Sequence, residues 1–315
     1  MAKIVILGGL GYIGSALCEL YRNEVQHQVT IVDNRFIPER IATFPAHFRF
    51  FHSDIAELDL IASLTADAEI VYFFAAQVEA ESSAERSEAV WRENFELPKS
   101  AIDRLPPGAR IVFPSSGNVF GGTPEGAKWR DLTERDPPHP RLPYAETKWE
   151  MEKFLNGSNR NFTVLRFGTN FGYAPGQRFN LVTNIFLKRA LEDEPIQLHG
   201  GGLNWRPTAC VTDCARAARF VAERSDTARE TYHVVSGSFT IRELAEKVIA
   251  LTQSKSGITV VDKIVPFNSY ALSSEKIRKL GFAFEWPLDR AIPDATRRLR
   301  ALVGKHALRK RSLAS

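Results

Sequence analysis

The stretch IVILGGLGYIGS, residues 4–15, decides the fold of this 315-residue chain. Four apolar residues run directly into a loop in which glycine recurs at positions 8, 11 and 14. Glycine allows a tight turn and lets the backbone come close to a phosphate group. The N–H groups of a helix that follows such a loop point at the phosphate, and the helix dipole favours negative charge there. The stretch therefore predicts a strand, a dinucleotide-binding loop and a helix.

Short apolar runs alternate with helix-like stretches through the first half of the chain. The runs expected to form strands are 4–7, 29–32, 48–51, 70–74, 111–114 and 162–166, and the helical patterns include 15–23, 90–104 and 144–155. Continuous apolar strands separated by helices indicate a parallel sheet that is buried on both faces. The sequence predicts an α/β fold with a Rossmann-type, doubly wound parallel sheet.

The pattern changes after residue 171. A loop at 172–178, a helix at 184–192 and a turn-rich stretch at 198–204 precede a helix at 214–224 and a strand at 231–235. We expect an NAD-binding Rossmann domain over 1–171, to which part of 206–235 returns. Residues 172–205 and 236–315 are expected to form a smaller C-terminal α/β lobe that binds the substrate.

Composition limits the class of partner. The chain has 41 basic and 37 acidic residues, a balance that gives no support to nucleic-acid binding, and the basic run at 305–311 is typical of a solvated terminus. Three cysteines without a CxxC pair argue against a disulfide scaffold and a zinc site. No run approaches the roughly 18 apolar residues of a membrane helix, and no secretory segment precedes the glycine loop. We therefore expect no membrane or metal, and a cytoplasmic protein.

Acidic residues follow the second and third expected strands. A carboxylate at Asp33 would accept hydrogen bonds from the adenosine ribose and repel a 2′-phosphate, which favours NAD, although Arg35 could serve NADP. Asp54 is placed to accept from the adenine amino group, with Ile55 on the ring, or to cap a helix. The fourth strand ends in residues that let a cofactor pass closely, namely Phe74, Ala75 and Ala76.

A serine, a tyrosine and a lysine have the spacing of a proton-transfer site. Ser115 and Ser116 end the fifth expected strand, and Tyr144 and Lys148 lie one turn apart at the start of a helix. An ammonium beside a phenol favours the phenolate and should lower the pKa of Tyr144. Tyr144 would then act as a general base, with Ser116 holding the reacting oxygen.

Together these motifs resemble the extended short-chain dehydrogenases/reductases, in the family of NAD-dependent nucleotide-sugar epimerases and dehydratases. The resemblance runs from Gly8 to about Phe282 and implies Ser116, Tyr144 and Lys148 as catalytic residues. Asn94 resembles the family's asparagine that props the active site, with a helix-surface residue as the alternative. The cofactor contacts that we expect are Gly8, Gly11, Tyr12, Ile13, Gly14, Asp33, Asn34, Asp54, Ile55, Phe74, Ala75, Ala76, Asn94, Ser115, Tyr144, Lys148 and Phe167.

The resemblance also implies a substrate site and a dimer. Residues 164–172, VLRFGTNFG, are similar to the family's LRxxNxxG segment, although threonine replaces its asparagine at position 169. The expected substrate contacts are Ser116, Asn118, Tyr144, Thr169, Asn170, Arg178, Asn180, Arg206 and Asn268. Nucleotide-sugar enzymes of this family pair through a four-helix bundle, for which the helices at 90–104 and from Tyr144 are the candidates.

The residues after Ser116 bear on the reaction. Dehydratases of the family carry acidic residues there, whereas this chain has Gly117 and Asn118, neither of which can exchange a proton with a sugar carbon. Tyr144 then remains as the obvious acid or base, which fits 4-epimerisation through a transient 4-keto sugar with tightly bound NAD. A 4-keto reductase, a dehydrogenase or a dehydratase of the same family, or a non-catalytic NAD(H)-binding regulator, remain alternatives.

Overall fold

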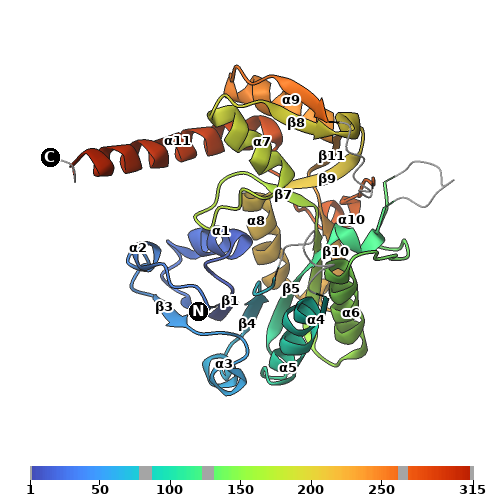
Figure 1. The fold of residues 1–315 in the computed structure, drawn as a ribbon. Helices are drawn as coiled ribbons and strands as arrows, with labels where there is room; N and C mark the ends of the chain where they lie inside the picture. The colour runs from blue at the N-terminus through green and yellow to red at the C-terminus, as the bar shows by residue number, and fades with distance from the viewer. Residues whose placement is uncertain (1, 78–86, 123–130, 262–268, 313–315) are drawn as a thin grey trace.

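The computed structural model describes residues 2–77, 87–122, 131–261 and 269–312. Its central sheet has seven strands in the order β10-β6-β5-β4-β1-β2-β3, and every pair is parallel (Figure 1). The strands are β1 (Lys3–Leu7), β2 (Gln28–Asp33), β3 (Phe48–His52), β4 (Ile70–Phe73), β5 (Arg110–Ser116), β6 (Asn161–Phe167) and β10 (Glu230–Val234). The strand order reverses between β1 and β4, where a doubly wound sheet opens a crevice at its carboxyl ends. The predicted Rossmann-type fold class is confirmed.

Helices cover both faces of this sheet, so its strands are buried on both sides. On one face α1 (Tyr12–Tyr21) and α8 (Val211–Ala222) share a core with strand residues such as Ile6 and Ile31. On the other face α3 (Leu58–Thr65), α5 (Leu97–Asp103) and α6 (Pro143–Gly157) pack around Val71 and Phe113. A short helix, α2 (Pro38–Ile41), follows β2.

The single helix predicted for residues 90–104 is divided. It consists of α4 (Ser87–Trp91), a π-helix (Arg92–Glu96) and α5, and the Leu97 N–H donates to the Arg92 carbonyl. Pro98 gives a physical reason, because a proline has no N–H and crowds the carbonyl four residues earlier. The wider turn contains the buried Asn94.

The remaining elements build a second core beyond the carboxyl end of β6. A three-stranded sheet has the order β11-β9-β7, and β8 pairs with β12 in a two-stranded sheet. The elements of this core are β7 (Thr169–Phe171), α7 (Val182–Leu191), β8 (Ile196–His199), β9 (Trp205–Cys210), β11 (Gly237–Thr240), α9 (Ile241–Thr252), β12 (Ile258–Val261) and α11 (Leu288–Ser312). The short helix α10 (Glu275–Lys279) instead buries Ile277 in the core of the central sheet. Phe171, Leu187, Ile196, Leu244 and Ile292 share this core.

Two features of this region were not predicted. Leu198 and His199, expected in a turn, lie in β8 because they pair in parallel with β12, and the turn is confined to a 3-10 stretch at Gly200–Gly202. Helix α11 runs far out from the body of the molecule (Figure 1). The proposed domain boundaries stay a prediction. No helix in the described part of the chain is long and apolar enough to span a membrane.

Candidate active site

A cleft of about 710 Å³ lies at the carboxyl ends of the central strands. Its lining residues come from the ends of β1 to β6 and the segments that follow them, from the π-helix, α5 and α6, from the loop after β7, and from Tyr270. The predicted cofactor residues that line it are Gly8, Gly11, Tyr12, Ile13, Gly14, Asp33, Asn34, Asp54, Ile55, Phe74, Ala75, Ala76, Ser115, Tyr144, Lys148 and Phe167. The predicted substrate residues that line it are Ser116, Asn118, Tyr144, Thr169, Asn170 and Arg178. Their contacts with ligands remain predictions.

The glycine loop is shaped by close backbone contacts. Gly8 has a φ of +88°, and a Cβ there would lie 2.5 Å from the Ala75 nitrogen after β4. A Cβ at Gly14 would lie 2.1 Å from the Gly8 carbonyl oxygen. Helix α1 starts after Gly11, and because this N-cap residue is a glycine, no side chain of its own caps the start of the helix. The loop thus places the start of α1 in the cleft, an arrangement that suits a pyrophosphate.

Asp33 is held at the end of β2 with only 6% of its surface exposed. Its Oδ2 accepts the Leu10 N–H at 2.8 Å, and its Oδ1 accepts the Arg35 N–H at 3.0 Å. The Arg35 Nε also lies 3.3 Å from Oδ1. The carboxylate therefore joins the glycine loop to the end of β2 in the cleft, which fits the predicted ribose site.

Asp54 contributes to the same end of the cleft. Its Oδ2 accepts from the Asn34 amide at 2.8 Å, and its Oδ1 accepts the Ala56 N–H at 2.9 Å. Asp54 therefore holds its own turn and lines the cleft, whereas the alternative of a helix cap is wrong, because the N-cap residue of α3 is Glu57. Arg35, named from the sequence as a possible contact of NADP, also lines the cleft. The lining residues that were not predicted from the sequence are Val32, Ser53, Ala56, Gln77, Arg92, Glu93, Leu97, Pro114, Gly168, Leu181 and Tyr270.

Asn94 supports the cleft from behind. It is 1% exposed, so the helix-surface alternative is wrong, and it is not among the described residues that line the cleft. Its Oδ1 accepts the Gln77 N–H at 2.9 Å, and its Nδ2 donates to the Gln77 carbonyl at 2.8 Å. The predicted direct contact with the cofactor is corrected to a hold on the backbone after β4, because the π-helix turns this amide toward Gln77.

Ser116, Tyr144 and Lys148 meet where β5 ends and α6 begins. The Ser116 Oγ accepts the Asn118 N–H at 3.1 Å, and Ser116 acts on the Tyr144 phenol so as to favour its deprotonated form. The Lys148 Nζ lies 5.9 Å from the centre of the Tyr144 ring and 4.9 Å from that of Phe113. Pro143 begins α6, which places Tyr144 in the first turn of this helix.

The electrostatics differ from the prediction. Burial raises the pKa of Tyr144 above its usual value, while the charge of Arg178 and the hydrogen bond with Ser116 oppose this rise. The predicted lowering of the Tyr144 pKa is therefore wrong for the chain by itself, because burial penalises the phenolate. Burial also lowers the pKa of Lys148 to about 8, against the opposing charge of Glu152.

A buried ion pair lies one turn further along α6. The Glu152 Oε2 accepts from the Arg166 Nη2 at 2.7 Å, and the Ser115 hydroxyl donates to the Glu152 Oε1. Glu152 is 0% exposed and Arg166 is 3% exposed. The network ties β5, β6 and α6 together beneath Lys148. No local motif indicates this network, because its members are far apart along the chain.

Two predicted substrate residues do not line the described cleft. Asn180 is exposed and accepts from the Arg178 Nε at 3.1 Å. Arg206 on β9 donates to the neighbouring Trp205 carbonyl at 3.0 Å, although its charge acts on Tyr270, which lines the cleft. Their directions follow from loop and strand geometry that the motifs do not specify. Asn268 lies outside the described residues.

Comparisons with known proteins agree with this architecture. The family model of the NAD dependent epimerase/dehydratase family matches residues 4–236. The low-salt glycan biosynthesis protein Agl12 of Haloferax volcanii is 26% identical over 91% of this chain and 94% of its own length. The dTDP-glucose 4,6-dehydratase of Streptomyces niveus is 27% identical over 89% of this chain and 88% of its own length.

A solved structure shows the same fold. The UDP-glucuronic acid 4-epimerase of Bacillus cereus, in complex with UDP-glucuronic acid and NAD, superposes with a TM-score of 0.83 at 20% identity. The alignment covers 95% of this chain and 99% of that one. The glycine loop, Asp33 and the Ser116–Tyr144–Lys148 group all fall within the matched residues. By its sequence match, its sheet and its cleft, the chain belongs to the NAD dependent epimerase/dehydratase family, which confirms the prediction of NAD as cofactor.

Proposed function

We propose that this protein is a nucleotide-sugar 4-epimerase that keeps its NAD bound through the reaction. The observation that carries the proposal is the closed space at Gly117, directly after Ser116. A Cβ at Gly117 would lie 2.8 Å from the Leu272 Cδ1 and 3.3 Å from the Tyr270 ring. The Leu272 side chain would therefore have to move before this position could take the acidic side chain that dehydratases of the family are expected to carry there.

Asn118, the next residue, is already engaged in a hydrogen bond. The Asn118 Oδ1 accepts from the Tyr270 hydroxyl at 2.8 Å. Among the described lining residues, the carboxylates are Asp33, Asp54 and Glu93, and none of them belongs to β5 or α6, the elements that carry Ser116 and Tyr144. This arrangement favours a reaction that moves one proton at one carbon–oxygen bond over the elimination of water.

In the proposed reaction, bound NAD supplies the acceptor and donor of a hydride at C4 of the sugar. Tyr144, as the phenolate, takes the proton of the 4-hydroxyl and later returns it. Ser116, which favours the deprotonated form of Tyr144, holds the same oxygen in place. Lys148 and Arg178 supply positive charge for the phenolate, and Arg178 already opposes the rise of the Tyr144 pKa. The 4-keto sugar then rotates in the site, so that C4 receives the hydride on its opposite face. Tyr144 returns the proton to the same oxygen.

The test is incubation of the protein with UDP-glucose, UDP-glucuronic acid and dTDP-glucose, followed by product NMR and absorbance near ~340 nm. We expect a 4-epimer to appear from at least one substrate, with no net change in absorbance. A 4-keto-6-deoxy product would establish a dehydratase instead. Stoichiometric consumption of added NADH or NADPH with a keto sugar would establish a reductase.

Assembly and location belong to the same proposal. We propose a homodimer through α4, α5 and α6, on the family resemblance, and a cytoplasmic protein. Size-exclusion chromatography with light scattering measures the first. A monomer at micromolar concentration would contradict it.

A further inference from the structure

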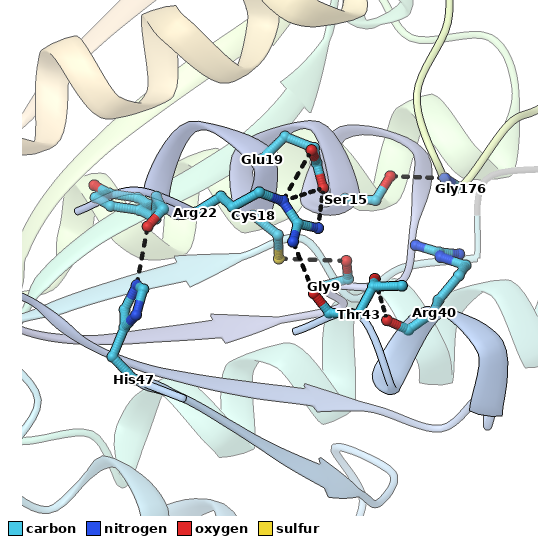
Figure 2. A network of polar contacts seen from close by, with 10 residues as sticks. Gly9, Ser15, Cys18, Glu19, Arg22, Arg40, Thr43, His47 and Gly176 are labelled. Carbon is cyan, nitrogen blue, oxygen red and sulfur yellow. Dashed lines mark hydrogen bonds and ion pairs between the residues drawn. The ribbon is translucent and has the colours of Figure 1, made fainter. Parts of the chain in front are cut away.

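The loop after β7, residues 172–181, is fastened to the start of α1. We refer to it as the 172–181 loop. It carries Arg178, which lines the cleft. A Cβ at Gly176 would lie 2.2 Å from the Gly11 carbonyl oxygen, so the backbones of the loop and the glycine loop touch directly. The Gly176 N–H also donates to the Ser15 Oγ at 2.8 Å (Figure 2).

Asn184 on α7 is the centre of this contact. Its side chain is 0% exposed and its amide makes three hydrogen bonds. The Oδ1 accepts the Gly172 N–H at 3.1 Å, which fixes the orientation of the amide because a backbone N–H can only donate. The Nδ2 donates to the Tyr12 hydroxyl at 2.9 Å and to the Arg178 carbonyl at 2.8 Å.

Tyr12 completes the link on the side of the glycine loop. It is the first residue of α1, it lines the cleft, and its hydroxyl donates to the Gly172 carbonyl at 2.5 Å. Burial raises the pKa of this phenol well above its usual value, so the hydroxyl keeps its proton and can donate to Gly172 while it accepts from Asn184. One buried side chain therefore joins the start of α1 to both ends of the segment from Gly172 to Arg178.

We propose that Asn184 is a positioning residue that couples occupation of the dinucleotide site to the placement of Arg178 in the substrate site. The inference rests on the proposed function for the identity of the two ligands. A dinucleotide that orders the start of α1 also fixes Tyr12, and Tyr12 with Asn184 fixes the backbone of Arg178. The second ligand then meets a guanidinium that is already ordered, so the affinities of the two ligands rise together.

Hydrogen–deuterium exchange of the 172–181 loop tests this coupling without turnover. In wild-type protein from which bound NAD has been removed, we expect added NAD to slow exchange at Gly172 and Gly176 by about fivefold or more. In Asn184→Ala, NAD should slow exchange at these residues by less than twofold. Calorimetry on the same variant should show that NAD still binds. Tyr12→Phe keeps the ring and removes only the hydroxyl, so it tests the same link if Asn184→Ala folds poorly. Ile185→Ala, at an exposed position of the same helix, is the control and should behave as the wild type.

Binding of UDP provides the second readout. NAD should tighten UDP binding to the wild type by about fivefold or more, and by less than twofold in Asn184→Ala. In an Arg178→Ala background, the further change Asn184→Ala should have no effect on UDP affinity, because both changes act through Arg178. A purely structural role would instead weaken NAD and UDP binding alike in both backgrounds.

NAD protection of the 172–181 loop that is equal in Asn184→Ala and the wild type would overturn the inference, as would its absence from the wild type. A failure of the proposed function has a different signature, which is no conversion of any nucleotide sugar by a wild-type protein in which NAD still protects the loop.

Discussion

Glu152 and Arg166 form an ion pair inside the protein, with the Arg166 Nη2 2.7 Å from the Glu152 Oε2, one turn along α6 from Lys148. Neither charge has access to solvent, and the Ser115 hydroxyl completes the coordination of the carboxylate. The pair therefore sets the positions of β5, β6 and α6 where they meet at the candidate site.

Loss of the Glu152 charge should be costly. Glu152→Gln leaves the Arg166 guanidinium buried without a countercharge, and we expect a loss of about 3–5 kcal/mol of unfolding free energy in urea. Glu150→Gln is the control on the same helix, because its partner Lys153 is solvent-exposed, and it should cost under about 1 kcal/mol. Equal effects of the two changes would show that burial of the pair has no energetic consequence.

Lys148 should destabilise the fold at neutral pH. Its pKa is lowered from 10.5 to about 8, so the folded protein binds this proton less tightly than the unfolded chain does. The penalty is complete below pH 8 and is relieved as the pH rises from about 8 to 10.5, so this group's contribution to stability rises with pH in that window.

Lys148→Met should therefore raise the unfolding free energy at pH 7 by up to about 3 kcal/mol while activity is lost. The gain should shrink toward zero near pH 10.5, which urea denaturation of both proteins at the two pH values would measure. A variant that is less stable than the wild type at pH 7 would contradict the lowered pKa.

Tyr144→Phe should abolish turnover and leave NAD bound. The change removes the proton-transferring hydroxyl and keeps the ring, so we expect a loss of about 10³-fold or more in kcat. The bound dinucleotide is measured by absorbance after denaturation of the purified protein. Activity within tenfold of the wild type would remove Tyr144 from its proposed role.

Gly14→Ala should remove NAD binding. A methyl group at this position would lie 2.1 Å from the Gly8 carbonyl oxygen, so the glycine loop cannot keep its path. We expect NAD affinity to fall by more than about tenfold. Gly108→Ala provides the control, because a Cβ there meets nothing within 4 Å, and it should leave NAD affinity unchanged. Calorimetric titration of both variants distinguishes the two results.

Local motifs predicted the parts of the site that lie at the junctions of strands, loops and helices. Gly8 directly follows β1, Asp33 and Ser116 end strands, and Tyr144 lies in the first turn of α6, so their positions follow from the sheet and the helix that covers it. The direction of Arg206 did not follow in this way, because it depends on the antiparallel pairing of β9 with β11.

Long-range burial was the main source of the remaining errors. The pKa of Tyr144 rises because residues distant in sequence enclose it, which no spacing of Tyr144 and Lys148 could indicate. The Asn94 amide turns toward Gln77 because the helix is widened just before Pro98. The Glu152–Arg166 pair joins a helix to a strand, and neither residue has a local pattern that identifies its partner.

The space beside Gly117 also constrains how this chain can change over time. Leu272 occupies the volume that any side chain at position 117 would need. A single substitution that introduces a carboxylate there would displace the Leu272 side chain, so a smaller residue at position 272 would make a new proton-transferring group easier to accommodate. Related sequences should therefore show these two sites varying as a pair, with a small residue at one accompanying a large residue at the other.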